Sequence, residues 1–154
     1  MKSSMNTKVL VGLAVFAVAI LVGCGGFDAQ SAMQEQSATN AQRMATLYVQ
    51  HQRANQGAGP KDEAKFRQYI ESINPKLLER IGVDPNQIDA LFASERDGEE
   101  LEIRYGVKGN AMSAPEPVVF EKTGVDGVRL VAFTGQKLEQ ISDDTKYQEL
   151  LKRK

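Results

Sequence analysis

Cysteine, histidine and tryptophan are almost absent from this sequence of 154 residues, which has one cysteine, one histidine and no tryptophan. A single cysteine cannot form an intramolecular disulfide, so a disulfide-stapled domain is excluded. The chain also lacks the several nitrogen or sulfur ligands that a zinc site needs. Because aromatic residues make up only 6% of the chain, a binding cleft rich in aromatic rings is not expected.

An excess of positive charge is also lacking, since 19 basic residues face 20 acidic ones and the net charge is −1. Loss of an N-terminal signal that carries Lys2 and Lys8 leaves 17 basic against 20 acidic side chains, a net charge of −3. Such a surface has no electrostatic reason to bind nucleic acid or anionic lipid headgroups. Nucleic acid is therefore not an expected partner.

The most distinctive feature that is present is a hydrophobic run near the N-terminus. The basic residues Lys2 and Lys8 precede it without any acid, and residues 9–22 form the apolar run, broken by one glycine. As a helix this run spans roughly 21 Å, which is short of the ~30 Å hydrocarbon core of a bilayer. A basic flank, a short apolar run and small residues at its end are typical of a secretory signal peptide, here residues 1–23.

The run ends in Leu21-Val22-Gly23-Cys24, and this motif resembles the lipobox of bacterial lipoproteins. The resemblance implies cleavage between Gly23 and Cys24 and attachment of a diacylglycerol to Cys24 through a thioether. It also implies acylation of the new amino terminus by a fatty acid such as palmitate. Two or three acyl chains hold a protein durably on a membrane, whereas one chain is marginal.

These expectations place the protein in the bacterial cell envelope, bound to the membrane through the lipid on Cys24. In bacteria that sort lipoproteins by an aspartate after the cysteine, Gly25 favours the outer membrane over the inner one. The alternative interpretation is an uncleaved helical anchor with an incidental cysteine. Both interpretations tether the chain to a membrane.

The 131 residues that remain after cleavage are enough for one domain. Residues 24–39 are rich in Gly, Gln, Ser and Ala and are expected to form a lipidated tether, and residues 40–154 a single globular domain. A Gly57-Ala58-Gly59-Pro60 segment is interpreted as a hinge. Apolar residues at three- and four-residue steps predict helices at residues 40–55, 62–73 and 76–81.

The second half of the domain carries strand and turn patterns. Hairpins are expected around Asp97-Gly98 and around residues 124–127. Asp143-Asp144 caps a last short helix with a basic end. The predicted fold class is therefore α+β, with N-terminal helices followed by a small antiparallel β-meander and a short C-terminal helix. The expected strands are residues 91–95, 101–107, 118–122, 128–134 and 137–141.

The mature part resembles the globular domains of pilin-like proteins (pseudopilins). The residues that carry this resemblance are the helix at 40–55 and the strands between 101 and 141. It implies a long N-terminal helix, a variable segment and a small antiparallel sheet. Pilin-like proteins keep a long hydrophobic helix behind a leader-peptidase site, whereas this chain has a lipobox, so the resemblance extends to the fold alone.

Residues that could carry catalysis have simpler structural interpretations. His51 is interpreted as a half-exposed residue near a helix end rather than a general base or metal ligand. No Ser–His–Asp or Cys–His spacing can be defended, and the acids fit no EF-hand loop and single out no catalytic pair. We therefore predict no catalytic residue, no metal and no cofactor. The acids interpreted as solvated turn and cap residues are Asp97, Glu99, Glu100, Glu102, Asp143 and Asp144.

The candidate binding segment is the loop at residues 108–117, because binding usually resides on loops that a rigid scaffold presents. Its candidate contact residues are Lys108, Asn110 and Met112, and an exposed methionine is an adaptable contact. The alternative is a plain strand connection in which two prolines protect a sheet edge.

The leading functional hypothesis is a non-enzymatic envelope lipoprotein that acts through contacts with another envelope protein. One alternative is a lipid-anchored hydrolase that uses carboxylates, and another is a pilin-like secretion or assembly component. A cleft with two facing acids would favour the hydrolase. An exposed, unpaired strand edge or an apolar patch would favour the other two hypotheses.

Overall fold

The computed structural model describes residues 39–109 and 114–153. The predicted signal peptide, the cleavage residue Gly23, the lipidation residue Cys24 and nearly all of the predicted tether lie outside the described residues. Asn110 and Met112 of the candidate binding loop lie outside them as well. Within the described residues, none of the helices has the length and apolar character that crossing a bilayer demands.

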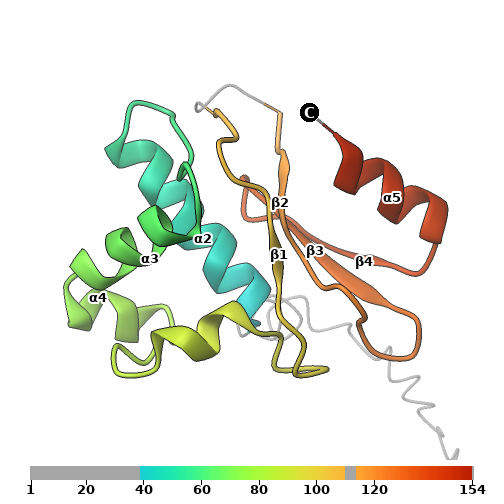
Figure 1. The fold of residues 1–154 in the computed structure, drawn as a ribbon, viewed down its shortest axis with the longest axis horizontal. Helices are drawn as coiled ribbons and strands as arrows, with labels where there is room; N and C mark the ends of the chain where they lie inside the picture. Colours follow the sequence, from blue (N-terminus) through green and yellow to red (C-terminus); the bar gives the residue numbers. More distant parts are fainter. Residues whose placement is uncertain (1–38, 110–113, 154) are drawn as a thin grey trace, which may run out of the picture.

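The described chain is a mixed helix and sheet fold with an antiparallel four-stranded sheet and a C-terminal helix, which confirms this much of the predicted fold class. The strands follow one another in the sheet in sequence order, so the sheet is a meander (Figure 1). Its strands are β1 (Glu102–Ile103), β2 (Pro117–Phe120), β3 (Arg129–Phe133) and β4 (Leu138–Ile141). The helices are α2 (Asn40–Ala54), α3 (Glu63–Ser72), α4 (Pro75–Arg80), the 3-10 helix η1 (Ile88–Phe92) and α5 (Asp144–Lys152).

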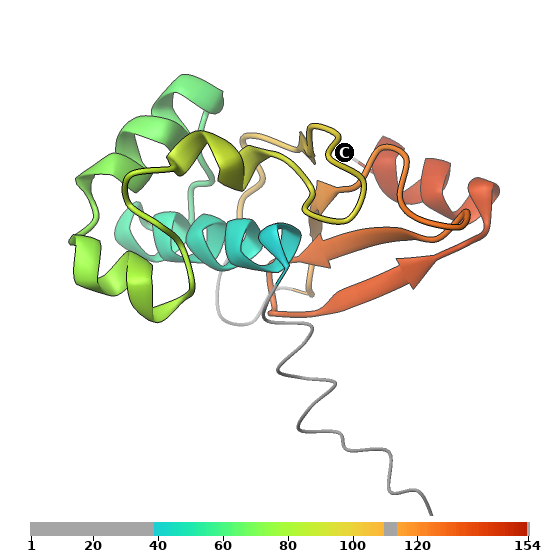
Figure 2. The ribbon, with the colours of Figure 1, turned by 90° about the horizontal axis from the view of Figure 1, so that it is seen from below.

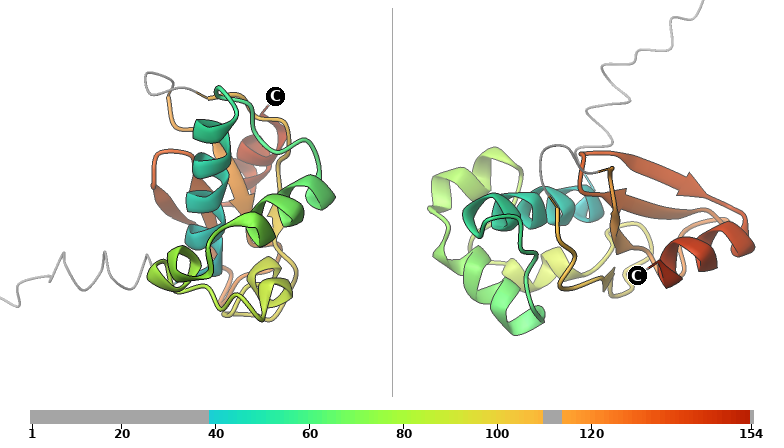
Figure 3. Two further views of the ribbon diagram at one scale, coloured as in Figure 1. Left: turned by 90° about the vertical axis from the view of Figure 1, so that its left-hand side faces the viewer. Right: turned by 90° about the horizontal axis from the view of Figure 1, so that it is seen from above.

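The sheet separates two layers of helices. In Figure 2, α2 lies against one face of the sheet with α3, α4 and η1 around it, and α5 lies on the other face. Figure 3 shows the same layers from two further sides. The strand register explains this, because residues that pair across strands share a face. Val119 pairs with Ala132 toward α2, and Phe120 pairs with Val131 toward α5.

Helix α2 is the main support of the larger core. Thr39 caps its start by accepting a hydrogen bond from the Gln42 N–H, as an N-cap residue does. Its apolar residues recur at three- and four-residue steps and form one continuous stripe that is buried against the sheet and α3. The buried apolar residues of α2 are Ala41, Met44, Ala45, Leu47 and Tyr48.

The predicted strand at residues 91–95 is wrong, because Leu91 and Phe92 belong to η1 and Ala93 forms only an isolated β-bridge. Ile88, Leu91 and Phe92 are spaced by three and four residues, so all three side chains face the core only as a helix. The Asp97-Gly98 turn is present nonetheless. It joins a single β-bridge between Ala93 and Glu100 rather than a hairpin of two strands.

The hairpin around residues 124–127 and the final helix are present as predicted. Glycine at positions 124 and 127 adopts positive φ in the turn between β2 and β3. Asp143 caps α5 by accepting a hydrogen bond from the Lys146 N–H. The last predicted strand corresponds to β4, which begins one residue later than expected.

Candidate functional site

A cleft of about 580 Å³ lies beside β1 and includes Lys108 of the candidate binding loop. The cleft draws on three separate segments: β1 with the residues that follow it, the approach to β2, and the end of α5. The structure thus places the predicted residue Lys108 in a cleft whose other lining residues were not predicted from the sequence. The charged and aromatic side chains that line the cleft are Glu102, Arg104, Tyr105, Lys108, Glu116 and Arg153.

The backbone that carries Lys108 is fixed by the Gly57–Pro60 segment. The Gly59 N–H donates to the Val107 carbonyl at 3.1 Å, and the Gly109 N–H donates to the Gly57 carbonyl at 2.9 Å. The Gly106 N–H donates to the Pro60 carbonyl at 2.7 Å. The hinge interpretation of this segment is therefore wrong, because its backbone is hydrogen-bonded to residues 106–109 beside the cleft.

Glycine is required at position 59 because the backbone approaches Tyr48 closely. A Cβ atom at Gly59 would lie 2.3 Å from the Tyr48 hydroxyl oxygen and 2.5 Å from the Val107 carbonyl oxygen. The Tyr48 hydroxyl accepts a hydrogen bond from the Val107 N–H at 3.0 Å. Burial raises the pKa of Tyr48 to about 12, because the phenolate would lose its hydration. These contacts join the middle of α2 to Val107, which lines the cleft.

The charges in the cleft do not neutralise one another. Arg104 donates through Nη1 to the Pro117 carbonyl at 2.9 Å, which fixes its guanidinium beside the start of β2. Three of the charged side chains are basic and two are acidic. Within the part of the chain that the structure describes, the ion pairs all join other residues. Unpaired charges held on a fixed backbone are available to a charged partner.

The two acids of the cleft are far apart along the sheet. Glu102 pairs with Phe120 across β1 and β2, and Glu116 directly precedes β2, four positions before Phe120. Four positions along β2 correspond to ~13 Å of extended strand. Carboxyl pairs in glycoside hydrolases are about 5–10 Å apart. The backbone spacing of Glu102 and Glu116 is therefore larger than the spacing of two catalytic carboxylates that flank a bond to be cleaved.

Arg153 reaches the cleft because α5 is held against the sheet. Tyr147 and Leu150 of α5 are buried with Phe120, Val131, Phe133 and Ile141. The Tyr147 hydroxyl donates to the Glu121 carbonyl at 2.8 Å.

The one buried carboxylate among the described residues belongs to Glu121, which is 1% exposed. Its Oε1 accepts a hydrogen bond from the Ser94 hydroxyl at 2.7 Å. Its Oε2 accepts from Arg96 Nη1 at 2.6 Å and from the Leu130 N–H at 2.8 Å. Both carboxylate oxygens are occupied by the protein itself, so Glu121 is an internal cross-link of the fold and not a free acid.

Sequence reasoning missed Glu121, and one signal could have found it. Val118, Val119 and Phe120 are three consecutive apolar residues, which indicates a strand covered on both faces. A charged residue directly after such a run is buried if the strand pairing continues through it. A buried acid then requires donors and a cation, which Ser94 and Arg96 supply.

The remaining candidate residues stand apart from the cleft. His51 is half-buried at the end of α2, with Nδ1 3.1 Å from the Ala58 carbonyl and its ring 4.9 Å from that of Tyr69. The exposed acids Glu99 and Glu100 lie at the turn before β1. No group of three or more His, Cys, Asp or Glu side chains that could hold a metal ion occurs within residues 39–109 and 114–153.

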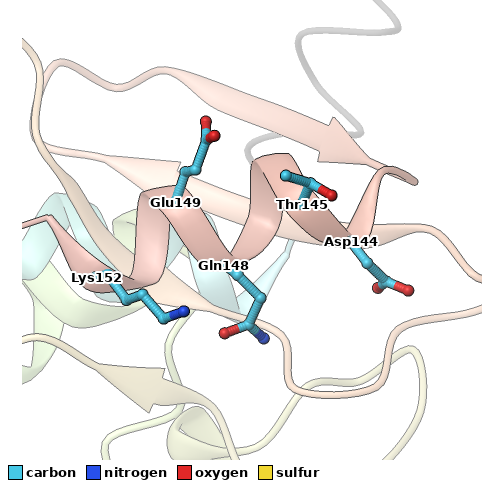
Figure 4. A pocket seen from close by; sticks show the side chains of 5 residues that line it. All are labelled: Asp144, Thr145, Gln148, Glu149 and Lys152. Atoms are coloured by element: carbon cyan, nitrogen blue, oxygen red, sulfur yellow. The ribbon is translucent and has the colours of Figure 1, made fainter.

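A second, shallower groove runs along α5. Its lining side chains all come from this helix, and Figure 4 shows that they do not converge. Gln148 points to one side of the helix and Glu149 to the other. Asp144, a third lining residue, is already paired with Arg129. The groove is therefore the exposed surface of a helix rather than a binding site.

Comparison of the chain with protein-family models, with curated proteins and with solved structures gives no match.

Proposed function

We propose that this chain is a lipid-anchored protein of the bacterial cell envelope, held through a lipid on Cys24. The observation that carries the proposal is the Leu21-Val22-Gly23-Cys24 motif at the end of a short apolar run with a basic flank. Fourteen residues separate Cys24 from Thr39, the first described residue. A fully extended chain of this length reaches about 50 Å, so the domain acts close to the membrane surface.

We further propose that the anchored domain is an α+β interaction module, with its helices before its sheet, and not an enzyme. The cleft beside β1 supports this role, because three cations and two acids line it without pairing among themselves. A partner segment with acidic side chains fits Arg104, Lys108 and Arg153. The partner in this proposal is another protein of the envelope.

A hydrolase remains the second candidate because Glu102 and Glu116 line the same cleft. Their ~13 Å separation along the strands argues against it. The pilin-like assembly component is the third candidate. It is supported by the packing of α2 against β2 and β3 of an antiparallel meander. No match to a solved structure adds to this support.

The first experiment is the intact mass of the chain and of its Cys24→Ala variant, each from a bacterial membrane fraction. We expect a mature protein that starts at Cys24 and is heavier by two or three acyl chains, and we expect the variant to lose this mass. A chain that is unmodified and still carries residues 1–23 would overturn the lipoprotein proposal. It would favour the helix-anchored, pilin-like alternative.

The second experiment tests the cleft by chemical crosslinking in membranes. Arg104→Glu and Lys108→Glu reverse charges in the cleft, and Lys122→Glu reverses an exposed charge outside it. We expect the two cleft variants to lose a specific crosslinked partner that the parent chain and Lys122→Glu retain. Equal crosslinking by all four chains would contradict the cleft as a docking site.

A further inference from the structure

Among the residues that the structure describes, none pairs with the outer edge of β4. The strand order is β1-β2-β3-β4, so β4 has a described neighbour on one side only. Figure 2 shows this edge at the border of the described fold, with no helix drawn over it. The opposite edge of the sheet differs, since the Leu101 N–H donates to the Phe92 carbonyl and the Gly106 N–H to the Pro60 carbonyl.

The backbone groups that face outward from β4 follow from its pairing with β3. The Phe133 N–H donates to the Lys137 carbonyl, so Lys137 points its backbone groups toward β3. Successive residues alternate in this respect. Leu138 and Gln140 therefore direct their N–H and C=O groups away from the sheet. An edge of this kind is a template for another strand.

We propose that this edge pairs with the same edge of a second copy of the chain, antiparallel, about a two-fold axis at Gln140. In this register Gln140 lies opposite the Gln140 of the second copy, and Leu138 lies opposite Ser142. The two sheets become one continuous sheet of eight strands. The proposal uses a surface separate from the cleft and adds self-association to the proposed function.

Charge complementarity selects this register. It sets Lys137, which pairs with Glu139 within its own chain, opposite Asp143 of the second copy, on the face that carries α5. These two residues form a non-hydrogen-bonded pair, in which side chains approach closely. If the two-fold axis were moved to Glu139, this residue would lie opposite the Glu139 of the second copy. Two carboxylates would then face each other, which is unfavourable. Moving it to Leu138 would bring the turn at Gln136, where φ is 60°, into the pairing.

The edge is too short to hold a dimer in dilute solution. Pairing over residues 138–142 buries much less than the ~1,200 Å² of stable complexes. Anchoring two chains on one membrane raises their effective concentration, which compensates for weak contacts. This step rests on the proposed lipid anchor. Association is therefore expected on membranes and in concentrated protein, and not in dilute solution.

Disulfide trapping of the full chain in membranes tests the pairing. Gln140→Cys places two thiols opposite each other at a Cα distance of about 5.5 Å, within reach of a disulfide. Ser142→Cys places them four residues apart on opposing strands, and Gln148→Cys lies on the exposed surface of α5. We expect a disulfide dimer for Gln140→Cys alone. No dimer, equal dimer from all three variants, or a disulfide to a different protein would each overturn the proposal.

A charge reversal provides the second variant, made in the Gln140→Cys background. Lys137→Asp sets two acids opposite each other and should reduce the dimer about threefold. Lys146→Asp is the matched control, because Lys146 also pairs with Glu139 within one chain. An equal reduction by both variants would contradict the register.

Failure of the anchor and failure of the pairing are distinguishable. Pelleting the same membranes shows whether the chain is anchored. Trapping is repeated with the protein concentrated to about 1 mM, near the effective concentration of tethered partners. A pelleted chain without the Gln140→Cys dimer overturns the pairing alone. A chain that does not pellet but forms the dimer at high concentration overturns the anchor and supports the pairing.

Discussion

Glu121 and Arg96 form an ion pair of 2.6 Å between Oε2 and Nη1, although 25 positions separate them in the sequence. The carboxylate also accepts the Leu130 N–H, in the place where a main-chain carbonyl of β2 would continue the ladder to β3. The displaced Glu121 carbonyl accepts the Tyr147 hydroxyl instead. One buried residue thereby joins the Ser94–Arg96 turn and β3 through its side chain and α5 through its carbonyl.

Removal of the cation from this pair should destabilise the domain strongly. Arg96→Met leaves a buried carboxylate without its charge partner, and Arg96 itself is 26% exposed. We expect a loss of about 2–4 kcal/mol in the free energy of unfolding, measured by urea denaturation. The control is Lys122→Met, which breaks the exposed pair with Glu100 and should cost about 0–1 kcal/mol. Equal losses would refute an internal cross-link at Glu121.

The sequence was sufficient where a local pattern decides the structure. The turn glycines of residues 124–127 place β2 beside β3, and Asp143 marks the start of α5, because both signals act within a few residues. The strand prediction failed at Leu91 and Phe92, the last two residues of η1, since a short apolar run fits a strand or a helix equally well. Its helical form depends on burial against α2 and α3, which no local pattern reveals.

The candidate site was less predictable than the fold for the same physical reason. Lys108 was predicted as a contact residue because loops carry binding residues, and it lines the cleft. Arg104, Glu116 and Arg153 come from three segments, and only the tertiary arrangement brings them to one cleft. The docking of Gly57–Pro60 beside Val107 also depends on contacts of high sequence separation.

Glycine 59 should be intolerant of a side chain. In Gly59→Ala the new Cβ meets the Tyr48 hydroxyl and the Val107 main-chain oxygen, and the latter cannot move without breaking its hydrogen bonds. We expect a loss of about 2–3 kcal/mol in urea denaturation. Gly109→Ala is the matched control, because its Cβ meets only the side-chain amide of Gln52. A loss for Gly109→Ala as large as that for Gly59→Ala would show that the contacts with Tyr48 and Val107 do not set the cost at position 59.

The cap of α5 should be measurable on its own. Asp143→Ala removes the carboxylate that accepts the Lys146 N–H at 2.9 Å, and we expect a loss of about 1 kcal/mol in thermal or urea unfolding. Asp143→Asn keeps a side-chain acceptor and should retain most of this stability. If Asn and Ala cost the same, the charge of Asp143 contributes and the cap hydrogen bond does not.

Alkaline pH should destabilise the fold through Tyr48. Burial raises its pKa to about 12, while the unfolded chain titrates near the ordinary value of 10.0. Between these values the folded state keeps a proton that the unfolded state releases, so stability is fully present below pH 10 and falls as pH rises toward 12. The slope is about 1.4 kcal/mol per pH unit, or about 2–3 kcal/mol over the interval.

Comparison with Tyr48→Phe isolates this contribution. Burial also raises the pKa values of Tyr69, Tyr105 and Tyr147, so part of the alkaline loss remains in the variant. At pH 8 the variant should be less stable by about 1–2 kcal/mol, because the Val107 N–H loses its acceptor. The parent chain should then lose more stability than the variant between pH 10 and 12, so the two curves of unfolding free energy converge. Curves that stay parallel across this interval would mean that the Tyr48 hydroxyl titrates alike in the folded and unfolded chains.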